Sequence, residues 1–281
     1  MRRSHYLSHL GESVSLHGDR MSFAVAGLAL MLATLTPYPA SAAPADPDDD
    51  PKPAGQSQGT TGGFAFGAPR GFFAVKFGLY APRAESDIFV FNAEQLTLDL
   101  NSYNAPLFGI DIGYSVNDRV DVVFGFEYSS SSPVSEMRDF VDELGSPITQ
   151  QTRLRQMPLT VSVRFNLVER GRSFGSYAWV PKSVVPYVGA GGGINWWRYE
   201  QFGDFVDFVD FTIFTDHFRT QGWEPIVHAF GGVDWAVSPS FVLEFEARYS
   251  WAEGQLAPAF VGFEPIDLSG FRGMVGASFR F

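Results

Sequence analysis

The feature that most constrains the fold is an alternation of apolar and mixed side chains, with a period of two residues, between residues 70 and 281. In a β-strand successive side chains point to opposite faces, so this period predicts strands with one apolar face each. The predicted strands are 72–80, 106–114, 119–129, 159–167, 186–197, 227–235, 241–250 and 271–281. The chain is therefore predicted to be all-β, with eight antiparallel strands.

The distribution of charge indicates which face of these strands is the inside. The apolar face is nearly free of charge in all eight segments, whereas the other face combines glycine with charges of both signs. A membrane barrel faces its apolar side outward, and a soluble lipocalin-like barrel faces it inward. Aromatic residues also gather near the strand ends, where the membrane interfaces lie. These residues are Tyr80, Tyr114, Tyr128, Trp196, Trp235, Tyr249 and Trp251. The sequence thus predicts an eight-stranded antiparallel up-and-down transmembrane β-barrel.

The connections between the predicted strands alternate in length, as this topology requires. Tight turns occupy 115–118 and 238–240, and such turns face the periplasm. The long loops, which face outside, are 82–105, 130–151, 200–222 and 252–267. The connection 168–183 is too long for a periplasmic turn, so we expect an insertion or extended strand ends there. A pairing of 88–91 with 96–100 would give ten strands, and we treat that segment as a loop extension instead.

The N-terminal residues have the pattern of an export signal. The apolar run 23–35 follows Arg20, and the small-residue triplet 40–42 completes a cleavage site. The sequence therefore predicts a signal peptide over 1–42, with Met21 as an alternative start. Residues 43–69 are rich in Pro, Asp and Gly and are expected to form a disordered tail, which leaves 70–281 as the barrel.

Charge and composition exclude several classes of function. The formal net charge of −11 argues against nucleic acid as a partner, because a phosphate-binding surface needs clustered Lys and Arg. The absence of cysteine excludes disulfides, thiolate chemistry and a lipid anchor on an N-terminal cysteine. The acidic run 46–50 lacks the spacing of a calcium loop. We therefore expect no metal and no cofactor.

Three segments carry a family resemblance: PYVGAGGGINWW (186–197), GGVDWAVSPSFVLEFEARYSW (231–251) and the terminal GASFRF. Over residues 70–281 the chain resembles the small bacterial outer-membrane barrels grouped with OmpA and OmpW. The resemblance implies an outer-membrane location, contact with outer-membrane lipid and a monomeric state. It also implies that Gly276, Phe279 and Phe281 form the C-terminal signal read by the barrel assembly machinery, with Met274 departing from the usual polar residue.

The charged residues of the inward face form one candidate site. Basic and acidic residues are nearly balanced there, and an uncompensated buried charge would cost several kcal/mol. The predicted lumen charge network comprises Lys76, Asp111, Asp121, Glu127, Arg164, Asp234, Glu244, Glu246, Arg248 and Arg272, with Arg280 beside it. Because eight strands leave an interior just wide enough for side chains, the sequence predicts a salt-bridged plug. The alternative is a gated pore that opens when these pairs rearrange.

The segment 202–218 is a second candidate site, because phenylalanine recurs in it every third residue. Such a spacing fits neither a strand nor a long helix. Phe205, Phe208, Phe211 and Phe214 are candidates for a hydrophobic loop contact. They would either line the mouth of a channel for small apolar solutes or pack together in a loop that extends the strands.

An active site is not predicted. His217 and His228 raise the alternative of an outer-membrane lipid hydrolase, which needs a serine, a histidine and an acid in hydrogen-bond reach. Neither histidine lies in a recognised motif, so no catalytic residue is assigned and the chain is not expected to be an enzyme. The function that the sequence favours is a structural or surface role in the outer membrane with a largely plugged lumen. A narrow channel for apolar solutes is the alternative.

Overall fold

A computed structural model of the chain describes residues 67–174 and 178–281. The predicted signal peptide and residues 43–66 of the predicted tail lie outside these described residues. Within the described ranges, no helix combines the length and the apolar composition needed to cross a membrane.

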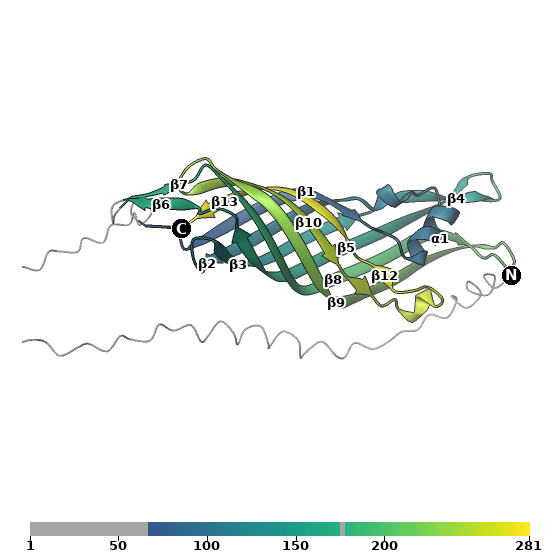
Figure 1. Cartoon of the computed structure of the whole chain (residues 1–281). Helices are drawn as coiled ribbons and strands as arrows, with labels where there is room; N and C mark the ends of the chain where they lie inside the picture. The colour runs from purple at the N-terminus through teal and green to yellow at the C-terminus, as the bar shows by residue number, and fades with distance from the viewer. Residues whose placement is uncertain (1–66, 175–177) are drawn as a thin grey trace, which may run out of the picture. The chain divides into compact units, whose positions relative to one another are not determined.

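Eight strands close into a ring (Figure 1). They are β1 (Gly71–Pro82), β2 (Ala105–Ser115), β3 (Val120–Ser131), β5 (Pro147–Asn166), β8 (Val184–Val206), β9 (Ile213–Ala236), β10 (Phe241–Trp251) and β13 (Gly270–Arg280). Each strand pairs antiparallel with its neighbours in the ring, and β1 pairs with both β2 and β13, which closes it. The predicted eight-stranded antiparallel up-and-down barrel is confirmed.

The side chains of the wall alternate as predicted. Phe77 is 62% exposed on the outer face, whereas its neighbour Lys76 is 3% exposed in the lumen. The same holds in β9, where Trp235 is 51% exposed and Asp234 only 1%. The placement of Tyr80 among the interfacial aromatics is wrong: its side chain lies in the lumen, where its hydroxyl donates a hydrogen bond to the carbonyl of Leu268.

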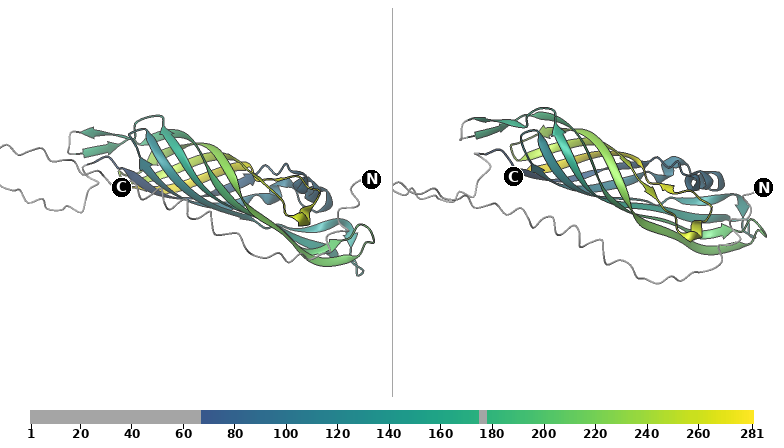
Figure 2. Two further views of the ribbon diagram at one scale, coloured as in Figure 1. Left: turned by 90° about the horizontal axis from the view of Figure 1, so that it is seen from below. Right: turned by 60° about the horizontal axis from the view of Figure 1, so that its bottom comes forward.

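The strands β5, β8 and β9 continue far beyond the others at the end that carries the long loops, and we call this part of the sheet the extension (Figure 2). In β9, residues 213–226 precede the first residue that pairs with β10, while β8 and β9 remain paired as far as Val206 and Ile213. The short strand β4 (Val134–Val141) pairs with the start of β5 and widens this extension. The Phe-rich segment 202–218 is therefore a strand hairpin and not an irregular loop.

Two loops fold over the inner face of the extension and form what we call the cap, residues 83–104 and 252–269. The first contains α1 (Asp87–Gln95) and η1 (Leu100–Tyr103), and the second contains β11 (Glu253–Gly254), η2 (Pro258–Phe260) and β12 (Ile266–Asp267). The alternative of a strand hairpin in 83–105 is wrong. Ile88, Phe89 and Asn92 are buried together, which is the spacing of one helix face.

The cap and the extension share a hydrophobic core of their own. It includes α1 residues, the inner face of β5, β8 and β9, and the second cap loop. Its fully buried members include Phe89, Trp197, Tyr199, Ile266 and Leu268. A barrel that spans a membrane needs no such core, so this end of the molecule is a folded structure in its own right.

The long connection 168–183 contains the two paired strands β6 (Gly171–Phe174) and β7 (Ala178–Pro181). This confirms an insertion at the short-turn end. Its Trp179 is 7% exposed and packs over Gly171, where an added Cβ would lie 2.5 Å from the indole ring.

Candidate functional site

Lys76 stands at the centre of the charge network in the lumen. Its ammonium nitrogen lies 2.7 Å from carboxylate oxygens of both Asp111 and Glu246, and 3.3 Å from Glu244. Glu244 and Glu246 are on β10, so these contacts cross β13. Gly276 of β13 is in register with both Lys76 and Glu244, and a Cβ on it would lie 2.8 Å from Cγ of Lys76. Glycine at 276 therefore leaves the room that the lysine side chain occupies.

A second group of charges fills the short-turn end of the lumen. The guanidinium of Arg164 pairs with Asp234 and lies 3.7 Å from Asp121. Arg280 lies 3.0 Å from the same carboxylate oxygen of Asp234. Arg170 approaches Asp121 to 3.4 Å and donates a hydrogen bond to the Ser115 hydroxyl. The arginine comes from the long connection, so the insertion adds a charge to the network.

A third group extends the network toward the cap. Arg248 pairs with Glu127 and, at 2.7 Å, with Glu246. Arg272 lies 3.0 Å from Glu127 and 4.4 Å above the ring of Tyr80. Beyond them the amide of Gln156 donates a hydrogen bond to the Tyr80 hydroxyl. Charged and polar groups thus follow one another from the short turns to the floor of the cap.

The structure brings all ten predicted network residues together in the lumen, and Arg280 with them. Sequence reasoning missed Arg170, which completes a set of six basic and six acidic groups among the described residues. The basic members are Lys76, Arg164, Arg170, Arg248, Arg272 and Arg280, and the acidic members are Asp111, Asp121, Glu127, Asp234, Glu244 and Glu246. All twelve side chains are buried, so the interior is formally neutral.

A serine and a histidine also meet inside the lumen. The Ser162 hydroxyl lies 2.8 Å from Nε2 of His228. Both side chains are nearly inaccessible, with 4% and 3% exposure, and in the described residues no hydrogen bond joins His228 to a carboxylate. His217, the other candidate, is at the outer surface of the extension and lies 3.6 Å from Glu200. The two histidines are therefore not parts of one site. The buried pair is closed to solvent and, among the described residues, has no carboxylate hydrogen-bonded to it.

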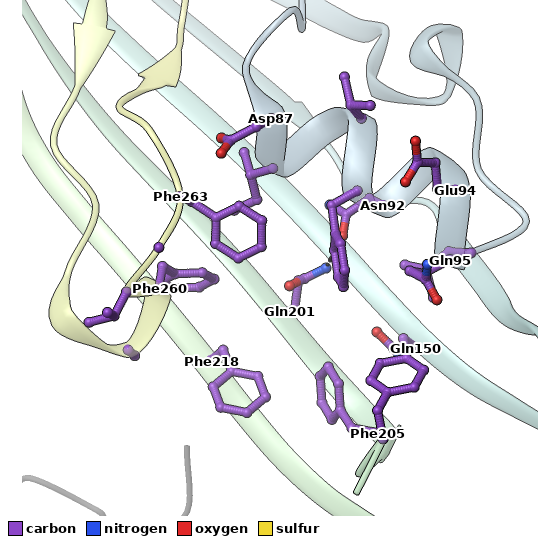
Figure 3. A pocket seen from close by; sticks show the side chains of 18 of the residues that line it. Asp87, Asn92, Glu94, Gln95, Gln150, Gln201, Phe205, Phe218, Phe260 and Phe263 are labelled. Carbon is purple, nitrogen blue, oxygen red and sulfur yellow. Dashed lines mark hydrogen bonds between the residues drawn. The ribbon is translucent and has the colours of Figure 1, made fainter. Parts of the chain in front are cut away.

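The second candidate site is a pocket of about 450 Å³ between α1, the second cap loop and the inner face of β8 and β9 (Figure 3). Phenylalanine dominates its wall. The ring of Phe205 packs edge-on against Phe218 at 4.8 Å and is stacked on Phe214 at 5.8 Å. Of the four predicted Phe residues, Phe205, Phe208 and Phe214 line the pocket.

Phe211 is not part of the pocket. It lies in the turn between β8 and β9 with a φ of 59°, is 64% exposed and stacks on Phe140. The three-residue spacing does not place Phe211 with the other rings, because it lies in the turn between two strands whose side chains alternate with a period of two. A spacing measured along the chain therefore does not place all four rings on one face.

The floor of the pocket is polar and ordered by one asparagine. The Asn92 amide donates hydrogen bonds to the hydroxyls of Tyr103 and Tyr199, and its carbonyl accepts one from Gln201. Burial raises the pKa of Tyr103 to about 12 and that of Tyr199 well above its ordinary value. The pocket rim carries Glu85, Asp87, Glu94 and Glu264, and none of its described lining residues is basic. The pocket is thus apolar inside and acidic at its edge.

The residues of the predicted C-terminal signal lie on the last strand and its end. The rings of Phe279 and Phe281 face outward with 53% and 55% exposure, and Gly276 faces the lumen opposite Lys76. Recognition by an assembly machinery stays a prediction.

The described residues hold no group of three or more His, Cys, Asp or Glu side chains arranged to bind a metal ion. No protein-family model matches the sequence, and no curated protein matches it either.

The strand arrangement is similar to that of small outer-membrane proteins of known structure. Neisserial surface protein A is 14% identical, with the similarity covering 75% of this chain and 97% of that chain at a TM-score of 0.40. For OprG from Pseudomonas aeruginosa the identity is 13%, the coverage 78% and 98%, and the TM-score 0.43. Ail of Yersinia pestis is 15% identical, with the similarity covering 75% of this chain and 99% of that chain at a TM-score of 0.40. In fold the chain is similar to small eight-stranded outer-membrane β-barrels, and its own closed ring of strand pairs establishes that fold.

Proposed function

We propose that this protein is an outer-membrane β-barrel with a closed lumen, which holds a folded cap at the cell surface in a structural or surface role. The observation that carries the proposal is the charge network, since paired side chains occupy the lumen from the Arg170–Asp121 pair to the Tyr80–Gln156 hydrogen bond. The outward apolar side chains of the wall support the membrane location.

Electrostatics also favour a closed lumen. Opening a water-filled path would require several pairs to separate together, because Lys76, Arg164 and Arg248 each contact more than one carboxylate. A shared network of this kind resists the loss of a single contact better than isolated pairs do. The closed state is therefore the resting state in this proposal.

Conductance in planar bilayers tests the closed lumen. The wild-type barrel is expected to give no discrete channels, whereas Glu246→Ala with Arg248→Ala should open a path, because it removes two paired side chains at constant net charge. The matched control is Arg119→Ala with Glu169→Ala, an exposed pair 3.7 Å apart at the surface. Wild-type channels as large as those of the lumen variant would contradict the proposal.

A second candidate function, the capture of small apolar solutes, is favoured by the phenylalanine pocket in the cap. Its lining of Phe205, Phe214 and Phe218 suits an apolar ligand, and its acidic rim disfavours an anionic one. In this case the cap would bind the solute and the barrel would anchor the cap.

Binding of a neutral fluorescent probe such as N-phenylnaphthylamine to the folded protein tests this second function. Phe214→Ser should weaken binding about tenfold, because it removes a ring from the pocket wall. Phe211→Ser is the matched control, since Phe211 lies in the same hairpin outside the pocket. Equal binding by both variants would exclude the pocket as the site.

A further inference from the structure

Four arginines lie close together on the outer wall of the extension, on three adjacent strands. Arg153 and Arg155 belong to β5, Arg198 to β8 and Arg219 to β9. Arg155 is the direct cross-strand partner of Arg198, and Glu200, two residues beyond Arg198, pairs in register with both Arg153 and Arg219. We call these four residues the arginine patch.

The patch is held in place by neutral and aromatic neighbours. Arg198 and Arg219 donate hydrogen bonds to the same side-chain oxygen of Gln221, at 3.0 and 2.5 Å. The guanidinium of Arg198 lies 4.9 Å above the ring of Trp196, and that of Arg153 lies 5.5 Å above Phe202. Guanidinium groups fixed in this way lose little side-chain entropy when they bind a ligand.

The positive charge of the patch is poorly compensated. Glu200 lies 3.9 Å from both Arg153 and Arg198, beyond hydrogen-bond distance. In the described ranges no carboxylate lies within ion-pair distance of Arg155 or Arg219. Desolvation, followed by the charge of Arg219, lowers the pKa of Arg198. In a chain with a net charge of −11, this local excess of positive charge favours an anionic partner.

The position of the patch indicates which anion it meets. Trp196 and its cross-strand partner Trp223 face outward directly below Arg198, and Trp223 is 50% exposed. Tryptophan on the outer wall of a barrel marks the membrane interface. The next outward residues on the same strands, away from the apolar band, are Arg198 and Gln221. The guanidinium groups therefore stand at the height of lipid headgroups, on the side of the long loops.

We infer that the arginine patch binds the phosphate groups of a phosphorylated lipid in the outer leaflet. Guanidinium groups bind phosphate oxygens by paired, charge-assisted hydrogen bonds. Two or three such bonds change affinity by at least about tenfold. The inference rests on the proposed membrane location and orientation, and it does not depend on whether the lumen is closed.

The test is a titration of the folded barrel in neutral detergent with bis-phosphorylated lipid A, followed by native mass spectrometry. The patch variant Arg155→Gln, Arg198→Gln and Arg219→Gln is compared with a matched control of three exposed arginines at the other end of the barrel, Arg70→Gln, Arg119→Gln and Arg172→Gln. Heat-modifiable gel mobility first shows that each variant folds as a barrel, which separates a failure of the fold from a failure of binding.

The patch variant is expected to bind lipid A at least about tenfold more weakly than wild type, and the control variant to bind like wild type. Dephosphorylated lipid A should bind the wild-type protein as weakly as phosphorylated lipid A binds the patch variant. The inference is overturned if both triple variants lose affinity equally or if the phosphates make no difference. It is also overturned if inorganic phosphate alone binds the wild-type protein as tightly as lipid A does, because the patch would then be a site for the free ion.

Discussion

The guanidinium of Arg170 lies 3.4 Å from the carboxylate of Asp121, which it reaches from a connection outside the ring of eight strands. It also donates hydrogen bonds to the Ser115 hydroxyl and to the carbonyl of Asn117, so that it covers the short-turn end of the lumen. A residue of the β6–β7 insertion thus completes the charge balance of the interior.

The first prediction concerns this contact. Arg170→Ala is expected to leave Asp121 with a weaker partner, Arg164 at 3.7 Å, and to admit water at the short-turn end. In the variant Ser115→Cys with Arg170→Ala, the thiol should therefore react faster with a small charged thiol reagent than it does in Ser115→Cys alone. Arg172→Ala, an exposed arginine of the same insertion, is the control and should leave the rate unchanged. Equal rates in both backgrounds would mean that Arg170 does not close the lumen.

The second prediction concerns the centre of the network. Lys76→Met removes the cation shared by Asp111, Glu244 and Glu246 and should lower the free energy of unfolding by about 3–5 kcal/mol, because it leaves buried carboxylates uncompensated. Urea unfolding in lipid vesicles, followed by tryptophan fluorescence, measures the change. Adding Glu246→Gln to Lys76→Met should restore part of the loss. A single variant as stable as wild type would show that the carboxylates find other partners.

The third prediction separates the cap from the barrel. In Gly254→Ala the new Cβ would lie 2.5 Å from the ring of Trp197, so the second cap loop must move and the cap should lose about 1–3 kcal/mol of stability. Faster proteolysis of the cap with unchanged heat-modifiable mobility is the expected result. Gly273→Ala is the control, since its Cβ meets its nearest neighbour only at 3.7 Å.

The fourth prediction is a loss of cap stability at alkaline pH. Burial raises the pKa of Tyr103 to about 12, so its phenol stays protonated in the folded cap but ionises from about pH 10 when the cap unfolds. The unfolded state then binds fewer protons, and stability falls as the pH rises from about 10 to 12. Proteolysis rates at pH 8 and pH 11 measure the effect.

The matched variant for this test is Tyr103→Phe with Tyr199→Phe. It should be less stable than wild type at pH 8, because the Asn92 amide loses both hydroxyl acceptors. It should also lose less stability between pH 8 and pH 11 than wild type does. An identical pH dependence in the two proteins would assign the alkaline effect to other groups.

The barrel was predictable from the sequence because each strand presents one face to the outside of the ring and the other to the lumen. Apolar and polar side chains therefore alternate with a period of two, and this alternation correctly predicted that Lys76, Asp234 and Arg272 face the lumen. The network could be listed for the same reason, although its pairing could not. The order of the strands in the ring decides that Lys76 of β1 meets Glu244 and Glu246 of β10 across β13.

The cap was not predictable by the same reasoning. Its core joins α1 to residues more than a hundred positions away, such as Tyr199, and no local period records such contacts. The helix itself is short and buries Ile88, Phe89 and Asn92, a face too narrow to stand out in the sequence. Arg170 was missed because it belongs to no strand, so alternation says nothing about where its side chain points.

The pairing of β1 with β13 has a consequence for the folding and unfolding of the barrel. These strands lie at opposite ends of the described chain, and their contact brings Lys76 within reach of the carboxylates of β10. Separation of β1 from β13 would leave Lys76 paired with Asp111 of β2 but would remove its contacts with Glu244 and Glu246, so partially closed forms are costly. Closure of the ring and neutralisation of its interior are therefore one event, which makes unfolding of the wall cooperative.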